Sequence, residues 1–79
     1  METDKEVNIS MDRQPVTSSN LASVGYDSGS ETLEVEFKNG SIYQYYNVPL
    51  VMFESLMQAP SVGSFFNANI RNNYACAKL

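Results

Sequence analysis

Hydrophobic and polar residues alternate most regularly in the middle of the chain. Leu33, Val35 and Phe37 fall on one side of an extended backbone, and Glu34 and Glu36 fall on the other. This pattern predicts a strand with one face toward a core and one face toward water. We therefore expect the two glutamates to lie on a solvated sheet surface rather than to serve as a catalytic carboxylate pair.

Two more strand patterns flank this segment. Residues 21–26 precede a cluster of turn-forming residues at 27–30, and residues 41–47 follow the hairpin signal Asn39-Gly40. Consecutive strands that are joined by short turns pair in antiparallel fashion. The sequence thus predicts a three-stranded antiparallel β-meander.

The hairpin at Gly40 admits two registers. A two-residue loop would pair Val35 with Gln44 and place an amide among apolar side chains, where burial of a polar group is costly. A three-residue loop, with Gly40 in the left-handed conformation, would pair Val35 with Tyr43 instead. We favour the three-residue loop, in which Tyr43 and Tyr45 face the core and the opposite face carries Ile42, Gln44 and Tyr46.

Two apolar stripes at helical spacing follow the third strand. Asn47 is a candidate cap of the first helix, Pro49 suits its first turn, and the helix is expected to end before Pro60. Its stripe consists of Leu50, Phe53, Leu56 and Met57. A second helix is expected to begin at Gly63 or Ser64, and its inner face carries Phe66, Ile70 and Tyr74. The predicted fold class is α+β, a three-stranded antiparallel β-meander packed with two α-helices.

The start of the chain differs from the rest because it has no sustained hydrophobic period. We expect residues 1–14 to form a flexible N-terminal tail and residues 15–79 to form the domain. The start also lacks an apolar run long enough for a signal peptide or membrane span, which favours a cytoplasmic protein with no membrane partner. A domain this small buries a modest fraction of its surface, so we expect a homo-oligomer to supplement its stability.

The composition argues against catalysis. The chain contains no histidine and a single cysteine, so the usual pairs of nucleophile and base and the His-containing zinc sets cannot be assembled. Cys76 is interpreted as an incidental thiol near the chain end. The four glycines do not have the spacing of a phosphate-binding loop. We expect a protein that is not an enzyme and that carries neither a metal nor a cofactor.

The charge of the chain bears on its partners. The formal net charge is −4, and the only cations after residue 13 are Lys38, Arg71 and Lys78. Non-specific nucleic-acid binding depends on neutralising phosphates with such residues. The charge therefore disfavours a nucleic-acid partner without excluding one.

Candidate ligand-binding residues gather around the second predicted helix. A helix that begins near Gly63 offers free backbone N–H groups, and Ser64 adds a hydroxyl donor. Arg71 follows Asn67 by one turn, so both side chains could hold the same carboxylate or phosphate. The alternatives are a plain helix cap and an ion pair of Arg71 with Glu54 or with a chain end.

The tyrosines divide into two groups. Tyr43 and Tyr45 are interpreted as core residues, whereas Tyr46 and Tyr26 could present rings on which a base stacks. The latter two are therefore added to the candidate ligand-binding residues.

Several consecutive motifs resemble the KTSC domain family, and the resemblance covers roughly residues 16–74. In chain order the motifs are residues 18–27, 33–40, 43–49, 53–57 and 61–71. The family occurs as small stand-alone bacterial and phage proteins and as a C-terminal extension of some lysyl-tRNA synthetases. The resemblance implies no catalytic activity and brings in an RNA-binding role as an alternative. The residues that match the family's helical motif are Gly63, Phe66, Asn67, Ile70 and Arg71.

Three hypotheses follow. The first is a noncatalytic binding module, an oligomer that captures a small anionic or nucleotide-like ligand through Arg71, Asn67, Ser64, Gly63, Tyr46 and Tyr26. By analogy with phage proteins, such an oligomer could be an anti-defence sponge that sequesters a host signal. The second is an RNA-binding accessory module of the lysyl-tRNA-synthetase-extension kind. The third is a protein-interaction module that uses the face formed by Ile42, Gln44 and Tyr46.

Overall fold

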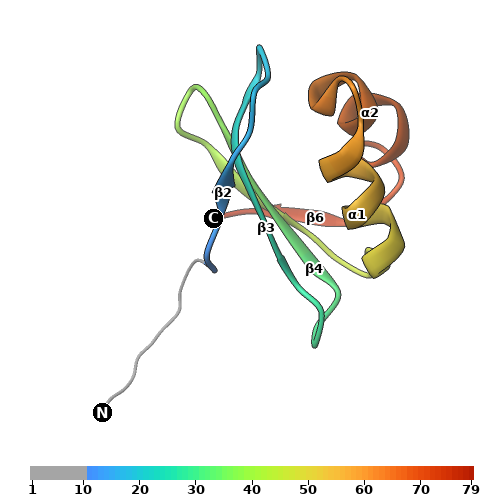
Figure 1. Ribbon diagram of the computed structural model, residues 1–79. Coiled ribbons are helices and arrows are strands. Elements are labelled where there is room, and N and C mark those ends of the chain that lie inside the picture. Colours follow the sequence, from blue (N-terminus) through green and yellow to red (C-terminus); the bar gives the residue numbers. More distant parts are fainter. Residues whose placement is uncertain (1–10) are drawn as a thin grey trace.

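The computed structural model describes residues 11–79, which form one antiparallel sheet with two helices on one of its faces (Figure 1). In sheet order the strands are β2 (Gln14–Pro15), β3 (Leu21–Asp27), β4 (Thr32–Phe37), β5 (Ile42–Tyr45) and β6 (Cys76–Lys78). The helices are α1 (Leu50–Gln58) and α2 (Val62–Asn69). The α+β class and the predicted meander, β3 to β5, are confirmed, and a short strand is added at each edge.

The two added strands lack the pattern from which strands are predicted. β2 has two residues, both exposed, and its Pro15 has no N–H to donate, which suits a sheet edge. β6 has three residues, all exposed, and lies at the end of the chain. Neither segment alternates between buried and exposed residues, so their pairing depends on the strands beside them.

The hairpin between β4 and β5 has the register that the sequence favours. Val35 pairs with Tyr43, and Leu33 pairs with Tyr45. Gly40 has a φ of 93°, in the left-handed region that the three-residue loop requires. Tyr45 consequently lies in the core, whereas Tyr43 is half-buried at its margin.

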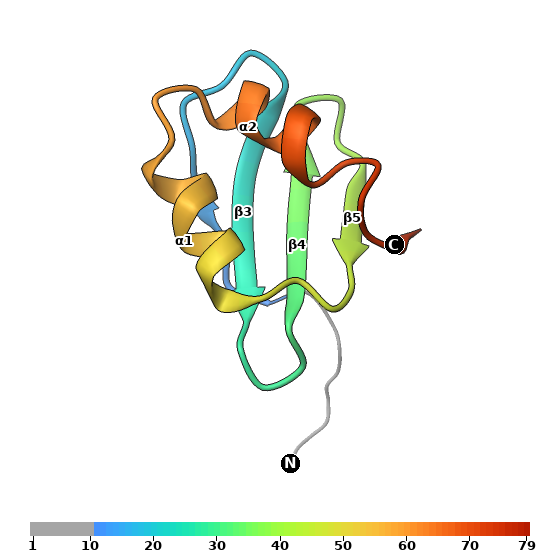
Figure 2. The same cartoon turned by 90° about the vertical axis from the view of Figure 1, so that its right-hand side faces the viewer.

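Both helices cover the same face of the sheet (Figure 2). The core lies between these two layers. Phe66 of α2 is its largest fully buried side chain. Its ring meets Phe37 and Tyr45 edge to face, with centroids 5.7 and 5.4 Å apart. The fully buried apolar residues around it are Leu21, Val24, Leu33, Val35, Val48, Leu56 and Ile70.

Two expectations for the first helix are wrong. Asn47 does not cap it: this residue has a φ of 61°, and Pro49 occupies the N-cap position without a side-chain hydrogen bond. Leu50 does not join the inner stripe, because it is 47% exposed. Val48 is buried and its N–H donates to the carbonyl of Glu31 (2.9 Å), so the chain is tied to the sheet before the helix begins.

The remaining helix ends follow the sequence except at the end of α2. This helix stops at Asn69, so Arg71 and Tyr74, which were expected on it, lie beyond its C-cap Ile70, although Tyr74 still packs against the core. α1 ends before Pro60, as predicted, with Ala59 as its C-cap. α2 begins at Val62, slightly earlier than expected, because the Ser61 hydroxyl accepts a hydrogen bond from the Ser64 N–H at 3.2 Å. Neither helix among residues 11–79 is long and apolar enough to cross a membrane.

Glu34 and Glu36 were expected to lie on a solvated surface of the sheet, and for Glu34 this expectation is wrong. Glu34 is fully buried instead of solvated, and its carboxylate accepts hydrogen bonds from the Arg13 guanidinium and from Gln44 Nε2 (2.9 Å). Arg13 Nε also donates to the Ser23 hydroxyl (2.9 Å), which donates to Glu36 (2.8 Å). These polar side chains form a connected network, which is why a charged residue tolerates burial here.

Gly25 explains how Arg13 reaches the buried carboxylate. Gly25 is the β3 partner of Glu34, and cross-strand partners share a face of the sheet. A Cβ on Gly25 would come within 2.5 Å of the backbone oxygen of Asp12. The missing side chain therefore gives the segment before β2 room to cross the sheet.

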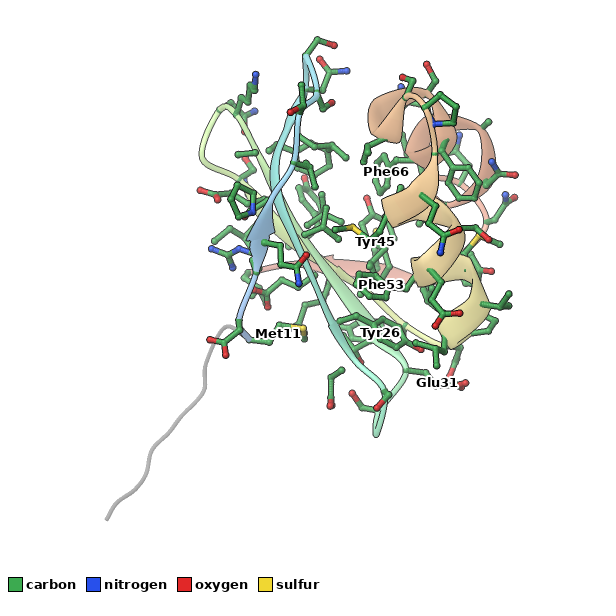
Figure 3. All side chains as sticks on the ribbon, in the orientation of Figure 1. Met11, Tyr26, Glu31, Tyr45, Phe53 and Phe66 are labelled. Carbon is green, nitrogen blue, oxygen red and sulfur yellow. The ribbon has the colours of Figure 1, made fainter. Side chains whose placement is uncertain are left out.

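The expected N-terminal tail is described only in part. Residues 1–10 lie outside the described residues. Residues 11–14 lie against the sheet, and β2 spans the boundary that was drawn between residues 14 and 15. Figure 3 shows Met11 on the side of the sheet away from both helices.

Candidate ligand-binding site

Helix α2 lies over the end of the sheet where β3 begins and β4 ends (Figure 2). A hollow of about 300 Å³ opens between residues of α2 and of this end of the sheet. We call it the helix hollow. It is lined by Ser19, Asn20, Leu21, Phe37, Lys38, Asn39, Gly63, Asn67 and Arg71. Three of the predicted ligand-binding residues, Gly63, Asn67 and Arg71, thus meet at one place.

A second hollow, of about 370 Å³, lies beside β5 and β6, and we call it the edge hollow. It is lined by Phe37, Asn39, Ser41, Tyr43, Tyr45, Arg71, Asn72 and Cys76. Three residues, Phe37, Asn39 and Arg71, line both hollows. The two hollows are therefore neighbours, and Arg71 lies at their boundary.

The charge of the lining is opposite to that of the chain. Asp and Glu outnumber Lys and Arg by nine to five in the sequence, yet none of the carboxylates of residues 11–79 lies in either lining, and Lys38 and Arg71 are both present. Glu34 and Glu36 lie on the opposite face of the sheet, and Glu31 lies at its other end (Figure 3). The fold thus separates a small positive region from an acidic remainder.

Arg71 is fixed at its backbone and weakly held at its side chain. Its N–H donates to the carbonyl of Phe66 (3.0 Å), directly after the buried Ile70. Within residues 11–79 its guanidinium donates a single hydrogen bond, a long one of 3.5 Å to Asn67 Oδ1. Among residues 11–79 the ion pairs are those of Arg13, so the alternative in which Arg71 pairs with Glu54 or the C-terminus is not observed.

Tyr45 lines the edge hollow, and the charge of Arg71 affects the pKa of its phenol. Burial raises the pKa of the Tyr45 phenol, and Cys76 adds to this rise, whereas the positive charge of Arg71 acts in the opposite direction. The phenol therefore stays neutral near pH 7. A neutral hydroxyl can both donate and accept a hydrogen bond at this place.

Gly63 has a structural reason for being a glycine. A Cβ on Gly63 would lie 2.9 Å from the Ser18 hydroxyl. The same hydroxyl accepts hydrogen bonds from the N–H groups of Asn20 and Leu21, each at 3.2 Å. The glycine thus lets α2 approach the segment that forms one wall of the helix hollow.

The other predicted residues lie elsewhere. Ser64 does not line either hollow, and its N–H is taken by Ser61. Tyr26 stacks on Phe53 with centroids 4.9 Å apart, and its hydroxyl donates to the Val48 carbonyl at 2.5 Å. Burial raises the pKa of Tyr26, and the nearby Glu31 and Asp27 add to the rise. The hydroxyl of Tyr46 donates to Gln44 Oε1 at 3.4 Å, and Tyr46 lines neither hollow.

Sequence reasoning missed several residues of the lining. Lys38, Asn39, Asn20 and Ser19 come from two turns that are distant in the sequence. The Lys38 N–H donates to the Asn20 carbonyl (2.9 Å), which brings these turns together. Antiparallel pairing of the first two predicted strands puts the start of the first beside the end of the second. This argument could have placed the two turns next to each other. Within residues 11–79 no three metal-ligating side chains gather at one place.

Comparison with known proteins identifies relatives over most of the chain. Residues 17–74 match the family model of the KTSC domain. The crystal structure of a KTSC domain protein from Yersinia pestis is similar, with a TM-score of 0.83 and 41% identity, and the match covers 89% of this chain and 99% of that one.

Two curated sequences illustrate the range of relatives. An uncharacterized protein of Stutzerimonas stutzeri is 44% identical over 57 residues, which cover 72% of this chain and 80% of that protein. A lysine–tRNA ligase of Trichormus variabilis is 41% identical over 54 residues, which cover 68% of this chain and 10% of the ligase. The same domain thus occurs both in small proteins and in a much larger enzyme.

Proposed function

Because the chain belongs to the KTSC domain family, and because its own fold gathers cations in an acidic protein, we propose that it is a noncatalytic binding module for a small anionic or nucleotide-like ligand. The ligand occupies the helix hollow. One observation carries the proposal: among residues 11–79, the lining contains Lys38 and Arg71 and no carboxylate.

The geometry favours an anion at this place for three reasons. Arg71 is not neutralised by any acid among residues 11–79. Its contact with Asn67 is long, so an incoming carboxylate or phosphate replaces a weak hydrogen bond with a charge-assisted one. The hollow also offers uncharged polar groups, including the amides of Asn20 and Asn39, which complete the coordination of an anion without adding charge.

The proposal includes assembly of several copies. Leu50 and Val51 are neighbours at the start of α1 and are 47% and 65% exposed. A contact that covers them would supplement the small core of a domain of this size. A binding module of this kind lowers the free concentration of its ligand, and several copies in one particle bind several ligands.

Native mass spectrometry of the purified chain, incubated with a small-molecule extract of its host cells, tests the proposal. We expect a defined oligomer that carries a discrete added mass. Arg71→Ala should lose that mass, whereas Lys78→Ala, which removes the same charge from a residue outside both linings, should keep it. Protein without any added mass, or equal masses on wild type and Arg71→Ala, would contradict the proposal.

RNA binding is a second candidate because relatives of this chain form part of lysine–tRNA ligases. Two cations in the helix hollow could neutralise two phosphates of a single strand. Binding should then weaken with salt with a slope of about −1.4 in a plot of log K against log salt concentration. A single-stranded RNA that binds with this slope, at any oligomeric state, would favour this candidate over capture of a small ligand.

A further inference from the structure

The helix hollow and the edge hollow are neighbours that differ in chemistry. They share Phe37, Asn39 and Arg71. The helix hollow adds Lys38 and Asn67, which are suited to a negatively charged group. The edge hollow adds Tyr43 and Tyr45 and is therefore aromatic.

The edge hollow can accept a planar ring. Phe37 and Tyr43 meet edge to face, with centroids 5.6 Å apart and an interplanar angle of 87°. Tyr43 is only half-buried, because it packs at the margin of the core. An aromatic ring that stands partly free beside a hollow is a surface on which a base stacks, largely without regard to its identity.

Arg71 connects the two hollows. A planar guanidinium binds phosphate through its N–H groups and also stacks on aromatic faces. Arg71 lines both hollows, so one side chain can contact both parts of a ligand that lies across it. Each hollow alone, at about 300 and 370 Å³, is at the lower end of the volumes typical of ligand sites, roughly 300–1,000 Å³.

From these observations we infer that the ligand is a phosphorylated molecule with a planar aromatic ring, of the nucleoside monophosphate class. Its phosphate lies in the helix hollow beside Lys38, Arg71 and Asn67. Its ring lies in the edge hollow against Tyr43. This inference rests on the proposed function and adds to it a separate site for the aromatic ring of the ligand.

Isothermal titration calorimetry of the full chain at constant ionic strength separates the two parts. The probes are inorganic phosphate, ribose 5-phosphate, adenosine and adenosine 5′-monophosphate. Stacking contributes about 1–3 kcal/mol per base, so the monophosphate should bind about 5- to 150-fold more tightly than ribose 5-phosphate. This ratio is measured on the wild type and does not depend on any variant being folded.

Variants then assign the ring to its place. Tyr43→Leu should remove most of the ratio and leave the affinity for ribose 5-phosphate unchanged. Tyr46→Leu is the matched control, because it makes the same change on the opposite face of the sheet and should preserve the ratio. Arg71→Ala should weaken both phosphorylated probes.

The outcomes distinguish the two proposals. If ribose 5-phosphate and the monophosphate bind equally well, the anion site stands and the two-part ligand is rejected. If Tyr46→Leu lowers the ratio as much as Tyr43→Leu does, the ring does not lie in the edge hollow and the inference is likewise rejected. If no phosphorylated probe binds, both the inference and the anion-binding function it rests on fail.

Discussion

Both faces of β4 contain fully buried side chains, but the two faces are built differently. Leu33 and Val35 face the helices and are fully buried, and Glu34, which points to the other face, is fully buried as well. Apolar side chains can be covered by any apolar neighbour of suitable shape. A carboxylate needs specific donors, and Glu34 obtains them from Arg13 and Gln44. The comparison teaches that the face toward the helices can accept different apolar neighbours, whereas the opposite face needs particular hydrogen-bond donors.

The largest expected effect tests the helix-covered face. Phe66→Ala removes a ring that is 1% exposed and that contacts Phe37 and Tyr45. We expect the free energy of unfolding to fall by about 4 kcal/mol, because the lost burial is added to the cost of a cavity. Urea unfolding followed by circular dichroism measures this change.

A matched pair of variants makes the first prediction specific. Leu79→Ala truncates an apolar residue that is 60% exposed and should change the free energy by no more than about 0.5 kcal/mol. If Phe66→Ala is itself unfolded, Phe66→Leu should show a smaller loss in the same direction. A loss below about 1 kcal/mol for Phe66→Ala would show that this ring is not central to the core.

The next effect tests the opposite face. Arg13→Met leaves the Glu34 carboxylate buried without its cation and should lower the free energy of unfolding by about 3 kcal/mol. We take the lower end of the usual range because the Arg13 side chain is 18% exposed. Denaturant unfolding of the single variant measures the loss.

A double-mutant cycle distinguishes a lost ion pair from lost packing. Glu34→Gln in the Arg13→Met background removes the unpaired charge, and its amide oxygen can still accept from Gln44. We expect this second change to recover at least half of the loss. No recovery would mean that Arg13 stabilises the sheet through its aliphatic stem, and the two faces would then be less different than proposed.

The smallest effect concerns Tyr45 and alkaline pH. Burial raises its pKa above the ordinary value of 10.0, so the folded state holds the phenolic proton more tightly than the unfolded state does. The stability that this provides is fully present below about pH 10 and is lost as the pH rises through the higher pKa of the folded state. Above pH 10 the free energy of unfolding of Tyr45→Phe should therefore fall less steeply than that of the wild type.

Thermal unfolding at several pH values checks this prediction. At pH 7 the variant should have nearly the stability of the wild type, because the ring is retained. Some alkaline loss should remain, since burial also raises the pKa of Tyr26. An unchanged alkaline curve in Tyr45→Phe would contradict the assignment.

Much of the fold could be predicted because its signals are local. The alternation around Val35 defined β4, and the Asn39-Gly40 pair with the cost of burying Gln44 selected the register. The first helix was placed correctly but its cap was not. A residue with positive φ, Asn47, and a buried Val48 lie before the helix, and neither follows from helix-capping preferences.

The candidate site was predictable only on its helical side. Helical spacing predicted that Asn67 and Arg71 are close together, and they are, although Arg71 lies just beyond the end of α2 and is held there by the bond of its N–H to the Phe66 carbonyl. Lys38 and Asn20 reach the same hollow because the ends of β3 and β4 are paired. The candidate tyrosines Tyr26 and Tyr46 lie elsewhere, and Tyr43, which was interpreted as core, lines the edge hollow.

The sequence by itself determined that β3, β4, β5 and the two helices form and which face of each packs on the core, because these properties depend on residues within a few positions of one another. The edge strands β2 and β6 carry no such local pattern. The tertiary structure alone decided that Glu34 is buried, since its cation is 21 positions away in the chain and reaches it only across Gly25. It also decided that, within the part of the chain that the structure describes, the two linings include cations and no acidic side chain. The charge of a surface region depends on which segments, distant in the sequence, come together in the fold. The pattern of residues along the chain does not specify this.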